Sequence, residues 1–318
     1  MKKLIVSSSP HIHDKTTTTD IMRDVLIALL PATVAGVVLF GIRALLTILV
    51  CVASAVLSEF FFNVICKKTQ TVKDLSAAVT GLILALCLPA KAELWQCALG
   101  AAFAIIVVKC LFGGIGYNFA NPAATARVFL LVAFASVGGG SMPILNASAD
   151  LTASATPLEI IKYGSDASLP SLLDMFLGNR MGAIGETCAL ALIIGGIYLI
   201  ARKIIHWEIP VIYIGTVFVL SLLIKQDLTL ALYEVLGGGL IIAAFFMITD
   251  YVTTPINKNG KMIFALGCAI ITVLIRFWGS YPEGVSFAIL LMNIVSPYIE
   301  KLCTPKPFGK VGKKNEKK

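Results

Sequence analysis

The sequence predicts an all-α polytopic membrane protein of about ten transmembrane helices, arranged as an inverted repeat of two five-helix halves. Hydrophobic residues make up 58% of the chain and charged residues only 14%, and the mean hydropathy is +0.89. A soluble domain of this size carries more charge on its solvated surface. Apolar stretches near the length that spans a bilayer recur along the whole chain.

Ten apolar stretches are each close to the roughly 20 residues that cross a hydrocarbon core of about 30 Å. They cover residues 25–41, 44–65, 75–90, 94–112, 122–138, 182–201, 209–224, 229–249, 261–278 and 282–302. Residues 1–24 mix charge, histidine and a threonine run without a signal-peptide pattern. We expect them to form a cytoplasmic N-terminal segment.

One long polar loop, residues 139–181, divides the stretches into halves at 25–138 and 182–302. Because five is an odd number, a duplicated second half lies inverted relative to the first. The third and eighth stretches share glycine-rich apolar patterns that precede proline breaks. The fifth and tenth are both entered through turns that contain glycine and proline.

The distribution of Lys and Arg predicts the orientation, because basic loops stay in the cytoplasm. With residues 1–24 inside, most of the 26 basic residues fall on the inner side, including the run in the tail 303–318. The outer group contains only Arg43, Lys91, Lys162, Arg180, Lys225 and Arg276. We therefore expect both termini inside and loop 139–181 outside, and the net charge of +8 needs no nucleic acid to explain it.

Cysteine and glycine patterns exclude several kinds of site. The eight cysteines are scattered through apolar stretches without CxxC or Cys/His spacing, so neither a zinc nor an iron–sulfur site is expected. The glycine-rich segments follow no predicted strand, and we expect NAD to be handled by a partner.

The loop contains a helix-start signal at Thr156. Thr156 is expected to be an N-cap, with Pro157 at the first helical position and Glu159 closing a capping box over residues 158–163. A helix N-terminus also suits a phosphate, so a phosphate esterified to Thr156 would lie favourably there. The two interpretations are compatible.

A second helix start is expected at Asn121, with Pro122 at the first helical position. This would leave a positive helix end and the amides of Asn118 and Asn121 near membrane depth. The pattern fits either a satisfied helix start or a wall facing a flavin ring or a quinone-like group.

Acidic residues inside apolar stretches are costly, and each is a functional suspect. The set is Glu59, Glu186, Glu234, Asp250 and Glu283. We favour Asp250 as an ion-path residue, because Thr253, Thr254 and a proline break follow it and would offer oxygen ligands to a cation. The alternative is a capped or solvated helix end.

Four segments resemble a known family. Residues 150–157 (DLTASATP) resemble the flavin-attachment motif of the family that contains the D subunit of Rnf complexes (ion-translocating ferredoxin:NAD oxidoreductases) and the B subunit of the sodium-translocating NADH:quinone reductase. Further similarity lies in residues 116–123 (GYNFANPA), 249–255 (TDYVTTP) and 281–293 (YPEGVSFAILLMN). The four occur in order over nearly the full chain.

The resemblance implies that a flavin transferase joins FMN through its phosphate to Thr156. Asp150, Ala155 and Pro157 match the motif, whereas Ala153 and Ser154 replace its usual Ser or Thr and Gly. It also implies a second, noncovalent riboflavin in the membrane part, whose contacts the sequence does not assign. Asn118, Asn121 and Glu283 are further candidate cofactor-binding residues. Partners would be the other membrane and peripheral subunits, together with Na⁺ or H⁺.

Two functions follow from these patterns. The first is an electron-transfer subunit of an ion pump in the bacterial cytoplasmic membrane, in which FMN lies on the outer loop and no complete active site lies in this chain. The second is a ten-helix solute channel or secondary transporter without flavin. The Thr156 motif favours the first.

Overall fold

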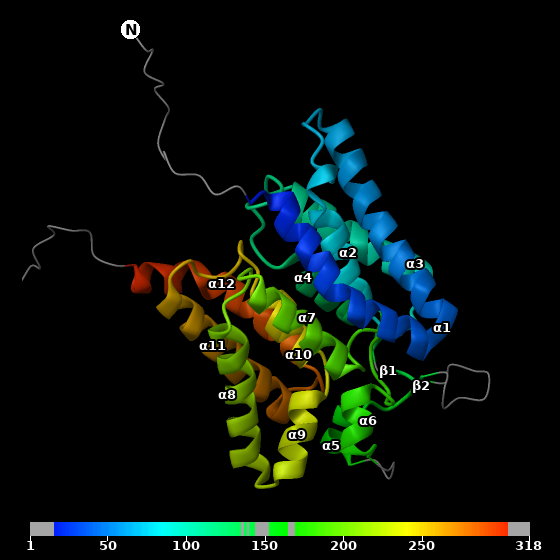
Figure 1. The fold of residues 1–318 in the computed structure, drawn as a ribbon, viewed down its shortest axis with the longest axis vertical. Helices are drawn as coiled ribbons and strands as arrows, with labels where there is room; N and C mark the ends of the chain where they lie inside the picture. Colours follow the sequence, from blue (N-terminus) through cyan, green and yellow to red (C-terminus); the bar gives the residue numbers. More distant parts are fainter. Residues whose placement is uncertain (1–15, 135–136, 139, 144–152, 165–168, 305–318) are drawn as a thin grey trace, which may run out of the picture.

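The computed structural model describes residues 16–134, 137–138, 140–143, 153–164 and 169–304, and it is mostly helical (Figure 1). It opens with α1 (Thr18–Ile65), whose 48 residues span roughly 72 Å at the rise of an α-helix. That length is more than twice the hydrocarbon core of a bilayer. The helix is kinked at Gly41, where φ is 64°, and Figure 1 shows two arms that meet at a sharp bend. The two arms match the first two predicted stretches.

The rest of the first half packs around α1. It consists of η1 (Val72–Asp74), α2 (Ser76–Leu86), α3 (Leu94–Phe103), the π-helical η2 (Ala104–Cys110) and α4 (Pro122–Ala133). α2 lies close against the second arm of α1, where a Cβ on Gly81 would be 2.8 Å from the carbonyl oxygen of Cys51. Glycine permits this approach of two backbones.

The segment between the halves holds two short strands and two short helices. They are β1 (Gly140–Ser141), β2 (Ala153–Ser154), α5 (Pro157–Tyr163) and α6 (Leu172–Leu177). β1 pairs antiparallel with β2, and the backbone of Ser141 also exchanges hydrogen bonds with Gly182 at 3.0 and 3.3 Å. β1 therefore joins the Thr156 loop to the start of the second half.

The second half consists of α7 (Ala189–Ala201), α8 (Glu208–Lys225), α9 (Leu228–Leu236), α10 (Leu240–Ile242), the π-helical η5 (Ala243–Met247), α11 (Lys258–Trp278) and α12 (Val285–Cys303). The expectation of a helix from residue 182 is wrong, because α7 begins at Ala189. The N–H groups of Ile184 and Gly185 instead bind the carbonyls of Leu88 and Leu86 at the end of α2. The stretch 229–249 is broken as well, with a bend of 62° between α9 and the following helix.

Ten spans are not confirmed. By length and apolar composition α1, α8, α11 and α12 can each cross a membrane, and the bent pair α9 and α10–η5 makes a fifth candidate. α2, α3 with η2, α4 and α7 are shorter apolar helices. The described residues thus form a polytopic, mostly helical membrane protein. α1 packs on α7 and α4 packs on α12, so elements at matching positions of the two halves lie against each other.

The contact between α1 and α7 gives a test of this packing. A Cβ on Gly195 would collide with the carbonyl oxygen of Ala28, whereas one on Gly215 of α8 would meet no atom within 4 Å. We expect Gly195→Ala to destabilise the protein by about 1–3 kcal/mol. Gly215→Ala should be neutral or slightly stabilising, because alanine is the better helix former. Thermal unfolding in detergent measures both, and equal melting temperatures would contradict the packing.

Candidate functional site

Two cavities lie toward opposite ends of α4. The first, here the Thr156 cavity, has a volume of about 320 Å³ and is partly open to solvent. Its walls come from α4, the Thr156 loop and the turn between α11 and α12, and its lining residues are Arg127, Leu131, Gly138, Thr156, Glu159, Tyr163, Ser280, Tyr281, Pro282 and Glu283. Thr156 and Glu283, which the sequence places far apart, therefore line one cavity.

The capping box predicted at Thr156 is confirmed. The Thr156 N–H donates to Oε2 of Glu159 at 2.6 Å, and the Glu159 N–H donates to Oγ1 of Thr156 at 3.3 Å. Pro157 stands at the first helical position and is buried. α5 has only seven residues, Pro157 has no N–H, and the N–H of Glu159 is used by Thr156. The helix end alone therefore offers little to a phosphate.

Gly140 makes room for Thr156. A Cβ on Gly140 would lie 2.6 Å from the Gly182 nitrogen and 2.9 Å from Cγ2 of Thr156. Thr156 is only 4% exposed, so its methyl group packs directly on the β1 backbone. Residue 140 must therefore be glycine for Thr156 to pack here, a requirement that the sequence patterns did not reveal.

Lys162 fastens α5 to the turn between α11 and α12. Its ammonium group donates to the carbonyls of Gly279 at 2.6 Å, Tyr281 at 2.7 Å and Ile275 at 3.4 Å. The hydroxyl of Tyr163 donates to the Ser280 carbonyl at 2.7 Å. Burial lowers the pKa of Lys162, and the Glu234 carboxylate opposes that shift. The helix that begins at Thr156 is thus held on the turn that leads to Glu283.

Arg127 lines the Thr156 cavity. Its side chain, on α4, lies 3.5 Å from Oε2 of Glu283 and donates to the Val137 carbonyl at 3.3 Å. Arg127, Leu131 and Glu283 also line an adjoining cavity, which we call the Glu186 cavity. The two cavities are therefore separated by one layer of side chains.

A second buried charge pair stands at the Glu186 cavity. Nη1 of Arg180 lies 3.5 Å from Oε1 of Glu186, and Nη2 donates to the carbonyls of Glu186 at 2.9 Å and Leu236 at 2.7 Å. Together with Arg127 and Glu283 the charges balance. Buried charges are tolerated when paired in this way.

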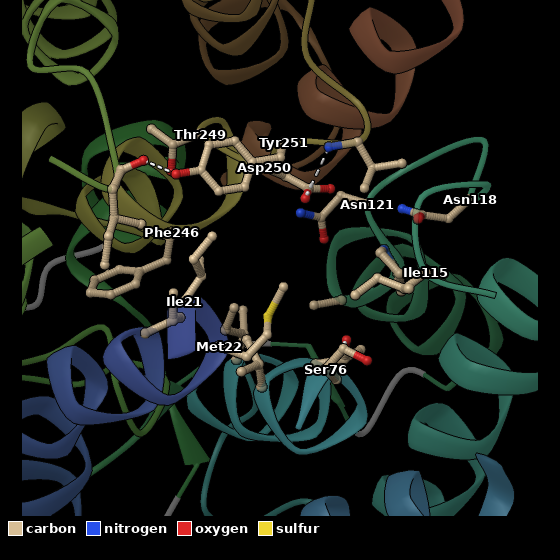
Figure 2. Close-up of a pocket in the computed structure, with 18 of the residues that line it drawn as sticks. Ile21, Met22, Ser76, Ile115, Asn118, Asn121, Phe246, Thr249, Asp250 and Tyr251 are labelled. Atoms are coloured by element: carbon tan, nitrogen blue, oxygen red, sulfur yellow. Dashed lines mark hydrogen bonds between the residues drawn. The ribbon is translucent and has the colours of Figure 1, made fainter. Parts of the chain in front are cut away.

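The other cavity, here the Asp250 cavity, has a volume of about 110 Å³ and widens toward solvent. Figure 2 shows Asn118, Asn121, Asp250 and Ser76 around one side and apolar residues such as Phe246 on the other. Residues of two separate motifs, Asn118 and Asn121 of residues 116–123 and Asp250 of residues 249–255, thus line one cavity.

Asn121 makes the expected helix start. Its Oδ1 accepts from the Ala124 N–H at 3.1 Å, and its Nδ2 donates to the Met247 carbonyl at 3.2 Å. Asn118 binds the nearby Ala120 carbonyl at 3.1 Å. The interpretation as a satisfied helix start is therefore confirmed for Asn121, although both asparagines also line the cavity.

Asp250 is held by the residues that follow it. Its carboxylate accepts from the Thr253 hydroxyl at 3.0 Å and the Val252 N–H at 3.4 Å, while the Thr254 hydroxyl donates to the Asp250 carbonyl oxygen. The hydroxyls expected to face a cation thus turn back on Asp250 itself. Among the described residues, no group of three or more His, Cys, Asp and Glu side chains is placed to hold a metal.

The remaining sequence candidates lie apart from the cavities. Ala155 is half-buried and Pro157 is buried, and neither lines a cavity described above, whereas Asp150 lies outside the described residues. Arg127 is one of the basic residues that the sequence assigned to the inner side, and it is only 6% exposed and pairs with Glu283. A cation inside an apolar stretch was the signal that could have revealed it.

Taken together, these features define a polytopic membrane protein with cavities toward both ends of one short helix, each cavity carrying several polar side chains among apolar ones. Comparison with known proteins is consistent with this class. The chain belongs to the NQR2, RnfD, RnfE family, whose model matches residues 5–309.

Relatives from three bacteria match over nearly their full lengths. The D subunit of the Na⁺-translocating ferredoxin:NAD⁺ oxidoreductase complex of Acetobacterium woodii is 45% identical, over 99% of this chain and 98% of its own. The D subunit of the proton-translocating complex of Clostridium ljungdahlii is 42% identical, over 96% of each chain. The D subunit of an ion-translocating oxidoreductase complex of Stutzerimonas stutzeri is 38% identical, over 91% and 92%.

The three hydrogen bonds of the Lys162 ammonium group, here the Lys162 clamp, give a test of the site's geometry. Lys162→Met removes three hydrogen bonds between α5 and the α11–α12 turn, so we expect faster amide hydrogen exchange in residues 157–163. Lys301→Met is the matched control, because Lys301 lies over the Tyr298 ring near the end of α12 and lines no described pocket with α5. Exchange in α5 that is equal in the wild type and both variants would show that the clamp does not hold this helix.

Proposed function

We propose that this chain is the membrane electron-transfer subunit of an ion-translocating ferredoxin:NAD oxidoreductase complex, with FMN esterified to Thr156. The observation that carries the proposal is that Thr156, in register with the attachment motif, lines the same cavity as the ion pair of Arg127 and Glu283. The names of the relatives agree with it. The chain would lie in the bacterial cytoplasmic membrane with both termini in the cytoplasm and the Thr156 loop outside.

The residues around Thr156 fit a flavin nucleotide. The cavity volume of about 320 Å³ lies at the lower end of the range for cofactor sites, and Arg127 supplies a cation for the negative charge of a phosphodiester or of a reduced ring. FMN, when bound, supplies the electron-carrying chemistry. Glu283 orients Arg127, and Lys162 holds α5 on the turn that carries Glu283.

We place the second, noncovalent flavin, such as riboflavin, at the Asp250 cavity, whose volume of about 110 Å³ would have to widen toward solvent to admit the ring. Its apolar wall suits the flat face of a ring, and the polar side chains opposite offer donors and acceptors for the ring's carbonyl and N–H groups. No hydroxyl in register with the attachment motif is near it. α4 links the two sites, since Pro122 lines one cavity and Arg127 the other, roughly 8 Å apart along the helix axis.

The alternative of a channel or transporter without flavin gives no role to the arrangement at Thr156. The transported ion stays open between Na⁺ and H⁺, because relatives of nearly equal identity carry names with either ion. The other components of the complex, and a flavin transferase during maturation, are the proposed partners.

Thr156→Ala removes the hydroxyl to which FMN would be esterified, and we expect covalent flavin to be lost completely. Thr156→Ser keeps an oxygen and should retain part of the attachment. Thr152→Ala and Ser154→Ala remove the neighbouring hydroxyls and should leave attachment intact. In-gel fluorescence of the denatured chain and mass spectrometry of the loop peptide measure this. FMN mapped to residue 152 or 154, or an unmodified Thr156 in active complex, would overturn the proposal.

Asp250→Asn tests the proposed ion path. The substitution keeps the acceptor for Thr253 and removes the charge, so assembly should persist while ion transport by the reconstituted complex falls several-fold. Glu300→Gln, at an acidic position on α12 outside the cavity, is the control. Unchanged ion transport in assembled Asp250→Asn complex would show that Asp250 only ends a helix.

A further inference from the structure

A buried ion pair stands at the wall of the Asp250 cavity and has no role in the function proposed above. Lys109, in η2, and Glu59, in the second arm of α1, are 3% and 1% exposed, and Nζ of Lys109 lies 2.8 Å from Oε1 of Glu59. The lysine also donates to Oγ of Ser76, at the start of α2, at 2.6 Å. Three segments of the first half thus meet at one ammonium group.

Stability alone is a poor reason for this pair. Apolar residues of similar volume commonly replace a buried ion pair without loss of stability. The pair is also incompletely satisfied, because Oε1 of Glu59 accepts from Thr71 at 2.7 Å whereas the buried Oε2 has no partner among the described residues. Ionisable residues at membrane depth more often serve ligands or ions.

The position of Lys109 points to a ligand. Lys109 and Ser76 line the same cavity as Asn118, Asn121 and Asp250. An ammonium group has three N–H donors, and the described contacts of Lys109 use two, to Glu59 and Ser76. The cavity therefore combines a cation, a carboxylate and two amides with an apolar wall. A planar heterocycle that has carbonyl acceptors beside an N–H donor matches this set.

We propose that Lys109 is the cationic contact for the carbonyl edge of a ring ligand in the Asp250 cavity, and that Glu59 orients the lysine and neutralises it when the cavity is empty. The inference rests on the proposed flavin in this cavity and assigns its recognition to a residue of the first half. A cation beside the ring binds the reduced, negatively charged ring more tightly than the neutral oxidised ring. Lys109 would therefore raise the midpoint potential of the bound flavin.

The test uses the purified full-length chain after removal of noncovalent flavin, with riboflavin as the probe. Lys109→Met should weaken riboflavin binding about tenfold or more, as expected for loss of a charged hydrogen bond. It should also shift the midpoint potential of the bound riboflavin to more negative values. Lys109→Arg should restore much of both properties. Lys73→Met, at an exposed position near the same end of α2, should change neither.

A double variant separates the loss of a ligand contact from misfolding of the protein. Lys109→Met leaves Glu59 buried without its partner, whereas Lys109→Met with Glu59→Gln removes both charges and should fold like the wild type. The same loss of affinity and the same negative shift in a double variant of wild-type thermal stability would support the inference. Wild-type affinity and potential in that variant would overturn it and leave the second flavin site standing. Failure of the wild-type chain to bind riboflavin would overturn both.

Discussion

The two hydrogen bonds of the Asn121 side chain hold the cavities in their relation to each other. Its oxygen starts α4 by binding the Ala124 N–H, and its amide nitrogen binds the Met247 carbonyl at the end of the π-helical η5. The first bond belongs to the first half and the second reaches across to the broken span of the second half. One side chain thus fixes where α4 begins and joins the halves at membrane depth, where an unpaired backbone carbonyl would be costly.

A chain of side-chain contacts links α4, which Asn121 begins, to the turn before α12 and to α5. α4 carries Arg127 to the wall of the Thr156 cavity, and Arg127 pairs with Glu283 at the turn before α12. That turn is bound by Lys162 of α5, and α5 begins at Thr156. A displacement of one end of α4 would therefore also move the residues at its other end. This physical link suits a protein in which two redox groups must keep a constant separation.

Local features of the fold could be predicted from the sequence. The capping box of Thr156 and Glu159 and the helix start at Asn121 depend on residues within three positions of each other, and both are present. The breaks inside the stretches 182–201 and 229–249 could not be predicted. Residues 182–188 are apolar enough for a helix, but their N–H groups bind Ser141, Leu86 and Leu88, which lie far away in the sequence.

Among the charged residues too, partners that lie far apart in the sequence could not be predicted. Lys109 pairs with Glu59 and Arg276 with Glu234 across 50 and 42 residues, and hydropathy contains no information about such partners. The basic residues were interpreted only as markers of orientation, although Lys109, Arg127, Arg180 and Arg276 are all buried. Cations inside apolar stretches therefore merit the same attention as acids.

The central claim is that one chain holds two flavins in different ways, one esterified at Thr156 and one bound without a covalent bond in the Asp250 cavity. Acid precipitation of the purified chain, followed by flavin quantification in pellet and supernatant, tests it most directly. The account predicts about one equivalent of FMN in the pellet and about one of riboflavin in the supernatant. A pellet without flavin from active complex would contradict it.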